Sequence, residues 1–182
     1  MVVAESERLI LRWLTTDDSA FILKIYNTDG FLQYIGDRNI RSLEDAHQFL
    51  LESPLKMYDK HKVSLYRVEL KSTAEVIGLC GLINRDTLSD IDIGYAFLPE
   101  FCGKGYAIEA ARATMEYAKT ELELNRVVAI TQRDNKTSIA LLLKLGMTLE
   151  GEYIDPGSES SPDSIDDSGD DTRIDIYGIS LN

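Results

Sequence analysis

The sequence predicts a single α/β domain, of the α+β kind, built on a mixed and mostly antiparallel twisted sheet of about six to seven strands with about four helices. Three observations support this prediction. Short runs of alternating or continuous apolar residues, typical of strands, are spread along the chain. Three such runs follow one another and lead into a turn with two glycines and a helical stretch. The next apolar run does not alternate, as expected of a strand that is parallel to its neighbour and buried on both faces.

The length of the chain bounds the number of domains. With 182 residues, 44% of them hydrophobic, the chain can bury one core, and we expect residues 1–182 to form a single domain. No apolar run reaches about 18 residues and no apolar leader follows a basic start, so neither membrane spanning nor export is indicated. We therefore expect a soluble, cytoplasmic protein.

The N-terminal part is expected to hold one strand and two helices. Apolar residues alternate at residues 8–13, which predicts the first strand, and a helical stripe follows it. Residues 31–40 contain a glycine and two aromatic side chains and are expected to form a connection. Ser42 and Asp45 have the spacing of a capping box at the start of the second helix, and Pro54 is expected to end that helix.

The remaining elements follow in a regular order. The three runs of the expected meander are separated by polar turns, and the last of them leads through the glycines into a long helix. A buried strand, a helix that stops at Gly146 and a C-terminal hairpin complete the chain. The expected strands are residues 64–70, 76–83, 90–97, 126–131, 147–153 and 173–181, and the expected helices begin near residues 104 and 135.

Two glycines lie where the strand at residues 90–97 is expected to turn into the long helix. Gly103 and Gly105 allow positive φ, and they remove side chains that would keep an anion away from the backbone. The first backbone N–H groups of a helix have no partner within the helix, so they can bind an anion such as a phosphate. Lys104 adds a positive charge between the two glycines. This glycine loop, residues 102–107, is therefore a candidate phosphate-binding site.

Two familiar phosphate-binding motifs do not fit the glycine loop. A P-loop requires Ser or Thr after its Gly-Lys pair, whereas Gly105 follows Lys104 here. A dinucleotide-binding loop requires a third glycine, and Ile108 stands at that position. A tight turn without a ligand is the alternative that the spacing leaves open.

The glycine loop and its flanks resemble motif A of the GNAT superfamily of acetyl-CoA-dependent N-acetyltransferases, in the wording IGYAFLPEFCGKGYAIEA. The wording is particularly similar to the branch that includes the ribosomal-protein-alanine N-acetyltransferases. The resemblance implies acetyl-CoA as a co-substrate, with its diphosphate on the N–H groups of a loop that reads Arg/Gln-x-x-Gly-x-Gly/Ala. Cys102 replaces the Arg or Gln, so that side-chain contact is lost or supplied elsewhere. The residues that the resemblance places at the cofactor are Tyr95, Phe97, Leu98, Cys102, Gly103, Lys104, Gly105, Tyr106, Ala107, Asn135 and Ser138.

The resemblance also predicts the shape of the sheet around this loop. The strands at residues 90–97 and 126–131 are expected to splay apart in a V that accepts the pantetheine arm of acetyl-CoA. Splayed strands leave backbone N–H and C=O groups without partners, and these groups can bond the amides of the arm. A backbone N–H near Tyr95 or Phe97 would then face the thioester oxygen.

Asn135 opens a stretch, NKTSIALLLKLGM, that is similar to motif B of the same family. In that motif the Asn side chain bonds the pantetheine arm, and Asn135 can also cap the helix that it opens. Many members protonate the departing CoA thiolate with a Tyr seven residues after the Asn, but Leu142 stands there. The ribosomal-protein branch is thought to use a Ser three residues after the Asn, and Ser138 holds that place. A backbone hydrogen bond near the helix start is the alternative role for Ser138.

The resemblance implies that an amine attacks the thioester directly in a ternary complex, without a covalent enzyme intermediate. The amine must lose a proton, which requires a carboxylate or a chain of water molecules. Asp92 is one candidate base, because this branch usually has Glu at that place in the phrase EIGY. Asp155 and Glu159 in the C-terminal hairpin region are alternatives, and Asp92 can instead be a structural acid of the strand.

The net charge of −12 argues against nucleic acid and anionic lipid as partners, and no cluster of Lys and Arg offsets it. It favours a cationic acceptor, which in this family would be a small amine or a protein N-terminus. Residues 155–172 are dense in Asp and Ser and are expected to be an inserted acidic loop, which either attracts a cationic amine or is simply solvated. Members of the family are commonly monomers or dimers, so a monomer or a homodimer is expected.

The two cysteines form neither a disulfide framework nor a zinc-binding pattern, and no metal is expected. Cys80 lies in an apolar run and is expected to be buried. Cys102 is expected to be a structural loop residue, although a helix N-terminus can lower the pKa of a thiol. A catalytically silent CoA-binding regulatory module is the alternative function, and Cys102 and Leu142 are the departures that favour it.

Overall fold

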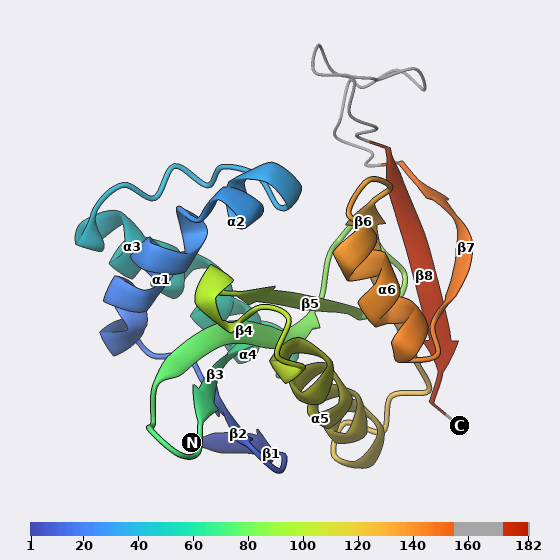
Figure 1. Ribbon diagram of the computed structural model, residues 1–182, viewed down its shortest axis with the longest axis horizontal. Helices are drawn as coiled ribbons and strands as arrows, with labels where there is room; N and C mark the ends of the chain where they lie inside the picture. The colour runs from blue at the N-terminus through green and yellow to red at the C-terminus, as the bar shows by residue number, and fades with distance from the viewer. Residues whose placement is uncertain (155–172, 182) are drawn as a thin grey trace.

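The structure is a computed structural model that describes residues 1–154 and 173–181, so the acidic segment expected at residues 155–172 lies outside the described residues. The described residues form one eight-stranded sheet in the order β1-β2-β3-β4-β5-β6-β8-β7 (Figure 1). All neighbouring strands are antiparallel except β5 and β6, which are parallel. The predicted mixed sheet is confirmed, with eight strands instead of about six to seven. The strands are β1 (Val2–Glu5), β2 (Leu9–Trp13), β3 (Leu65–Leu70), β4 (Val76–Ile83), β5 (Asp92–Phe97), β6 (Arg126–Gln132), β7 (Thr148–Tyr153) and β8 (Ile174–Ser180).

The strand that the sequence pattern does not predict is β1. Its four residues, VVAE, pair with β2 through a register shift between Val2 and Ala4. A run this short contains too few alternating residues for its periodicity to be recognised. The additional strand forms an edge of the sheet and lies next to β2.

Six α-helices occur in the described part of the chain, against about four expected. The first correction is α2, whose residues reach Tyr34 and occupy the start of the stretch expected to be a connection. The second is Pro54, which does not end the second helix but lies in a π-helical segment, Leu51–Leu55, that joins α3 to α4. A proline ring clashes with the carbonyl four residues earlier in an α-helix, and the wider π turn relieves this clash. The helices are α1 (Ser19–Tyr26), α2 (Asp29–Tyr34), α3 (Leu43–Leu50), α4 (Lys56–His61), α5 (Tyr106–Thr120) and α6 (Lys136–Lys144).

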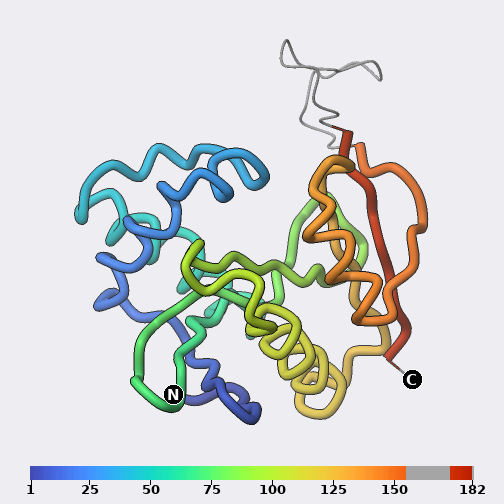
Figure 2. Tube along the Cα trace, in the orientation of Figure 1, coloured from blue at the N-terminus to red at the C-terminus, as the bar shows by residue number. Residues whose placement is uncertain are grey.

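Helices cover the sheet in two groups, and each group has its own core. Figure 2 shows α1–α3, in blue and cyan, standing apart from α5 in yellow and α6 in orange. Side chains of β5 alternate between the two cores. Ile93 packs in the cluster that contains Ala111 of α5 and Leu142 of α6. Ala96 packs in the other cluster, with residues of α1 and α3 such as Ile25.

The two parallel strands separate soon after they meet. β5 and β6 share the residue pair Asp92 and Val128, with a hydrogen bond from the Val128 N–H to the Ile91 carbonyl (3.0 Å). Beyond this point the pairing of β5 is with β4, and the pairing of β6 is with β8. The predicted splay between these strands is therefore present, and it opens toward the C-terminal ends of both.

Candidate functional site

The glycine loop adopts the conformation that its glycines allow. The φ angle is +73° at Gly103 and +82° at Gly105, values that favour glycine. Within the described residues, the N–H groups of Gly103, Lys104 and Gly105 have no hydrogen-bond partner. Helix α5 follows at Tyr106 without a side-chain cap, so its first N–H groups are also available. The loop thus presents consecutive backbone donors at the positive end of a 15-residue helix.

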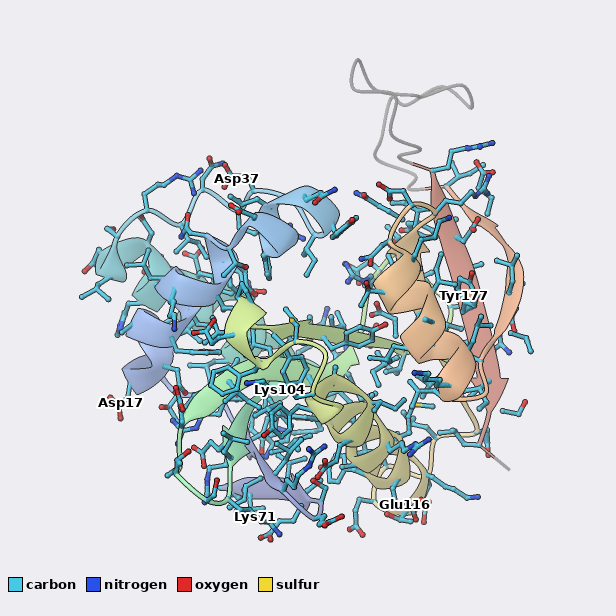
Figure 3. The ribbon with its side chains drawn as sticks, viewed as in Figure 1. Asp17, Asp37, Lys71, Lys104, Glu116 and Tyr177 are labelled. Atoms are coloured by element: carbon cyan, nitrogen blue, oxygen red, sulfur yellow. The ribbon has the colours of Figure 1, made fainter. Side chains whose placement is uncertain are left out.

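The space in front of this loop is open. Apart from its chain neighbours, no described residue lies within 4 Å of a Cβ atom built on Gly103. Lys104 lies at the start of α5, where Figure 3 labels it, and its Nζ is 5.4 Å from the centre of the Phe101 ring. An anion can therefore reach both the backbone donors and a nearby ammonium group. These are the features that the diphosphate of acetyl-CoA requires.

The Cys102 side chain lies against the end of β5, next to the glycine loop. Its thiol contacts the carbonyl oxygens of Leu98 (3.6 Å) and Phe97 (3.9 Å). Cys102 is exposed, yet desolvation of its sulfur and the nearby Glu100 carboxylate raise the pKa of the thiol. This shift is opposite to the lowered pKa of a reactive cysteine.

Tyr95 and Ser138 meet across the splay. The Tyr95 hydroxyl lies 2.8 Å from the Ser138 Oγ, and it also approaches the Ser138 carbonyl oxygen at 3.4 Å. Burial raises the pKa of Tyr95, although the hydrogen bond with Ser138 opposes this shift, so Tyr95 is a neutral phenol at physiological pH. The Ser138 N–H donates to the Asn135 Oδ1 (3.1 Å), which confirms the predicted cap of α6. β5 and α6 are thereby connected by a pair of hydroxyl groups.

Unpaired backbone donors of β5 point into the same splay. The Leu98 N–H donates to Ile77 in β4 (3.0 Å), and the Ile91 carbonyl accepts from Val128 in β6 (3.0 Å). Backbone groups along a regular strand alternate between its two neighbours, and the β4–β5 register is continuous. The N–H groups of Tyr95 and Phe97 therefore point toward β6, where β6 has already moved away.

Asp92 is a buried carboxylate at the root of the splay. It is 1% exposed, and its Oδ2 accepts a hydrogen bond from the Arg85 Nε at 3.0 Å. Its Oδ1 is buried and has no hydrogen-bond partner among the described residues. Burial raises the pKa of Asp92 and outweighs the opposing effect of Arg85. By alternation with Ile93, its side chain lies on the face of the sheet that carries α1–α3, opposite Tyr95.

Other residues predicted to contact the cofactor have varied surroundings. Leu98 is buried among residues of α1 and α3, and its N–H is already bonded to Ile77. Tyr106 packs beneath the guanidinium of Arg8, 4.4 Å from its ring centre. Ala107 is half-buried in the first turn of α5. Of these residues, Ala107 is the one whose small side chain lies beside the open donors without another role.

Sequence reasoning did not single out Arg8, which also lies at the glycine loop. Its Nη1 donates to the Lys104 carbonyl oxygen at 3.1 Å, across 96 residues of sequence. The pattern around Arg8 predicts a strand, but it carries no signal that this side chain reaches the loop. Only the packing of the β1–β2 hairpin against α5 places it there.

The described part of the chain has neither a cluster of metal-binding side chains nor a helix that could cross a membrane. Residues 1–154 and 173–181 contain no group of three or more His, Cys, Asp or Glu side chains arranged to hold a metal ion. Among their helices, none combines the length and the apolar character that crossing a bilayer requires. Cys80 is buried, as predicted, and 3.3 Å from the Thr114 hydroxyl.

Comparison with known proteins identifies the family. Residues 8–148 match the family model described as an acetyltransferase (GNAT) domain. The chain belongs to the GNAT acetyltransferases. It is 31% identical over 152 residues to the uncharacterized N-acetyltransferase YoaA of Bacillus subtilis, a match that covers 82% of this chain and 84% of that protein. The protein is therefore an N-acetyltransferase of this family, as its glycine loop predicts.

Two further known proteins are similar to this chain. Spermidine N(1)-acetyltransferase of Escherichia coli K12 is 28% identical over 147 residues, covering 79% of this chain and 75% of that protein. The ribosomal L7/L12 α-N-protein acetyltransferase RimL, solved in complex with coenzyme A, superposes with a TM-score of 0.80 at 17% identity. That match covers 99% of this chain and 98% of RimL, so the two share the whole fold.

Leu142 shows where this GNAT protein departs from many members of its family. Its side chain is 1% exposed and packs in the core between α6 and the sheet. A phenol at this position would have to leave the core to reach the splay. In this chain the hydroxyl groups at the splay come instead from Tyr95 and Ser138.

Proposed function

We propose that this protein transfers the acetyl group of acetyl-CoA to a primary amine, which attacks the thioester directly in a ternary complex. The observation that carries the proposal is the row of N–H groups from Gly103 to Gly105, which have no partner among the described residues and lie beside the splay of β5 and β6. Bound acetyl-CoA would supply the activated acetyl group as a thioester. The loop would bind the diphosphate, and the open edges of the splayed strands would bond the amides of the pantetheine arm.

In this proposal the N–H groups of Tyr95 and Phe97 stabilise the developing oxyanion. Both point into the splay and neither has a partner strand on that side. A donor that is already fixed in direction stabilises negative charge without reorganisation, and its removal typically costs about 100-fold to 1000-fold in rate. The strand backbone thus performs this step without a dedicated side chain.

Ser138 is the proposed proton donor to the departing thiolate. Its hydroxyl lies one turn inside α6, on the same face of the sheet as the start of α5. When Tyr95 donates to the Ser138 Oγ, the serine proton is free to point into the splay. The positive end of α6 favours negative charge on the nearby sulfur.

Asp92 is the proposed acceptor of the amine proton. Its unpartnered Oδ1 and its raised pKa are the features expected of a general base in a desolvated position. The carboxylate lies on the α1–α3 face, whereas Ser138 meets Tyr95 on the opposite face. The two proposed proton-transfer groups therefore lie on opposite faces of the sheet. The other candidate bases, Asp155 and Glu159, lie outside the described residues.

Cationic amines are the proposed acceptors. Known acceptors in the names of two relatives are spermidine and the N-terminus of a ribosomal protein. Both are amines, and the net charge of −12 attracts cations. The test is calorimetry with CoA, followed by thiol release from acetyl-CoA with polyamines, small amines and basic peptides. Binding without release on any acceptor would replace this proposal with the regulatory module, and no binding at millimolar CoA would remove both.

Replacing Ser138 by alanine is expected to lower kcat by about tenfold and to leave the Kd for CoA within about twofold. The effect is modest because a thiolate is a good leaving group that water can also protonate. Steady-state kinetics with the preferred amine measure the effect. Thr137→Ala, on the exposed neighbour in the same helix turn, is the matched control and should match wild type. An unchanged kcat in Ser138→Ala would show that Ser138 is not the proton donor and only takes part in the start of α6.

A further inference from the structure

Arg8 contacts the glycine loop at Lys104 and the residue that follows the loop's second glycine, Tyr106. Its Nη1 donates to the Lys104 carbonyl oxygen at 3.1 Å, and its guanidinium stacks on the Tyr106 ring at 4.4 Å. Its Nη2 would lie 3.3 Å from a Cβ at Gly105. The residue comes from the turn that precedes β2, so a distant segment of the chain supports the loop.

Glu109 in the first turn of α5 fixes the guanidinium in this place. Its Oε2 accepts from the Arg8 Nε and lies 2.6 Å from the Nη2, while its Oε1 accepts from the Arg8 backbone N–H at 2.8 Å. The Ser6 hydroxyl donates to the same Oε1 at 2.7 Å. Burial opposes ionisation of Glu109, but these hydrogen bonds from Ser6 and Arg8 hold its pKa below the ordinary value. The ion pair is therefore present at physiological pH.

The contact with Lys104 has a consequence for the loop's donors. A trans peptide unit is planar, and its C=O and N–H groups point in opposite directions. Because the Lys104 carbonyl points toward Arg8, the N–H of Gly105 must point away from Arg8. That N–H is one of the loop donors without a partner in the described residues.

We propose that Arg8 is a positioning residue for the cofactor diphosphate: by holding the Lys104 carbonyl, it directs the Gly105 N–H toward the bound phosphate. This inference rests on the proposed function. Cys102 stands where the family motif has Arg or Gln, and Arg8 contacts the same loop from another part of the chain. Arg8 contributes to phosphate binding through the position of the loop and not through its charge, because Glu109 already neutralises its guanidinium.

The test compares two acetyl donors on Arg8→Met. Acetyl-CoA carries the diphosphate, whereas acetyl-pantetheine, a truncated donor, lacks it. We expect the Kd for CoA, measured by calorimetry, to rise about tenfold, in line with the loss of a hydrogen bond from a charged donor. The KM for acetyl-CoA should rise by a similar factor, and the KM for acetyl-pantetheine should stay within about twofold of wild type. Equal losses with both donors would indicate general damage and overturn the inference.

Two further variants distinguish the position of the Arg8 guanidinium from its charge and from an effect on the stability of the fold. Arg8→Lys keeps the positive charge but lacks the planar fork that reaches Glu109 and Lys104 together, so it should weaken CoA binding nearly as much as Arg8→Met. Wild-type affinity in Arg8→Lys would show that charge alone suffices and overturn the inference. Arg12→Met is the matched control, because Arg12 lies in β2 and pairs with Glu69 at 2.7 Å, away from the loop. It should bind CoA like wild type.

The outcomes also separate this inference from the proposed function. If the wild-type protein does not bind CoA, the proposed function fails, and the role of Arg8 is overturned with it because no diphosphate is bound at the loop. If wild type binds CoA and transfers acetyl groups while Arg8→Met does the same with unchanged constants, only the role of Arg8 is overturned. Thermal unfolding of each variant, compared with Arg12→Met, identifies any loss that comes from the fold.

Discussion

Replacing Asp92 by asparagine is expected to lower kcat/KM for the amine by about 100-fold, at the low end of the range for a general base. The substitution removes the proposed proton acceptor while keeping its shape. Asparagine can still accept a hydrogen bond from the Arg85 Nε through its side-chain carbonyl. Steady-state kinetics with the preferred amine measure the effect, and the Kd for CoA should be unchanged.

The pH dependence gives this prediction a second readout. Asp92 accepts a proton only when ionised, so kcat/KM should fall as pH drops through its pKa, which burial places above the usual range of an aspartate. In Asp92→Asn this fall should be absent. Because burial raises this pKa in the folded state, ionisation of Asp92 lowers the free energy of unfolding. The loss begins as pH rises above about 4, where an aspartate in the unfolded chain ionises. Near neutral pH the variant should therefore be no less stable than wild type.

Asp90→Asn is the matched control for this experiment. Asp90 lies two residues earlier, is more exposed and pairs with the Arg126 Nε at 3.1 Å. Its loss should change kcat/KM by less than about twofold, as for an ordinary surface ion pair. If Asp92→Asn keeps wild-type kcat/KM and its pH profile, Asp92 is a structural acid of β5, and the base must come from elsewhere.

Gly105→Val is expected to raise the Kd for CoA by about 100-fold, because it acts on the loop in two ways. Valine is strained at a φ of +82°, which costs about 1–2 kcal/mol of folding free energy or forces the loop to another conformation. In addition, its Cβ would lie 3.3 Å from the Arg8 Nη2 and displace the guanidinium. Calorimetry with CoA and denaturant unfolding separate the loss of binding from the loss of stability.

Gly36→Val provides the comparison for backbone strain alone. Gly36 has a φ of +98°, a Cβ there would meet nothing within 4 Å, and it lies in the segment after α2, outside the glycine loop. We expect a similar loss of stability and a CoA affinity close to wild type. If Gly105→Val binds CoA as tightly as Gly36→Val and wild type, the glycine loop does not bind the cofactor.

The glycine loop and the start of α6 could be predicted from the sequence because their features are local. Positive φ at Gly103 and Gly105, the helix start after them and the Asn135 cap each depend on a few consecutive residues. Errors occur where packing overrides local pattern. Pro54 predicts a helix end, yet it lies inside a π-helical turn that continues into α4. Phe31 is expected in a connection, yet it belongs to α2, and its ring packs 4.1 Å from the Tyr26 ring.

Residue order was enough to predict a turn with two glycines, a strand before it and a helix after it, since backbone conformation and helix ends are properties of short segments. Folding in three dimensions was needed to bring Arg8 to Lys104 across 96 residues and Tyr95 to Ser138 across 43. It was also needed to bury Asp92 beside a splayed pair of strands. These contacts depend on how hairpins and helices pack, and no spacing along the chain records that.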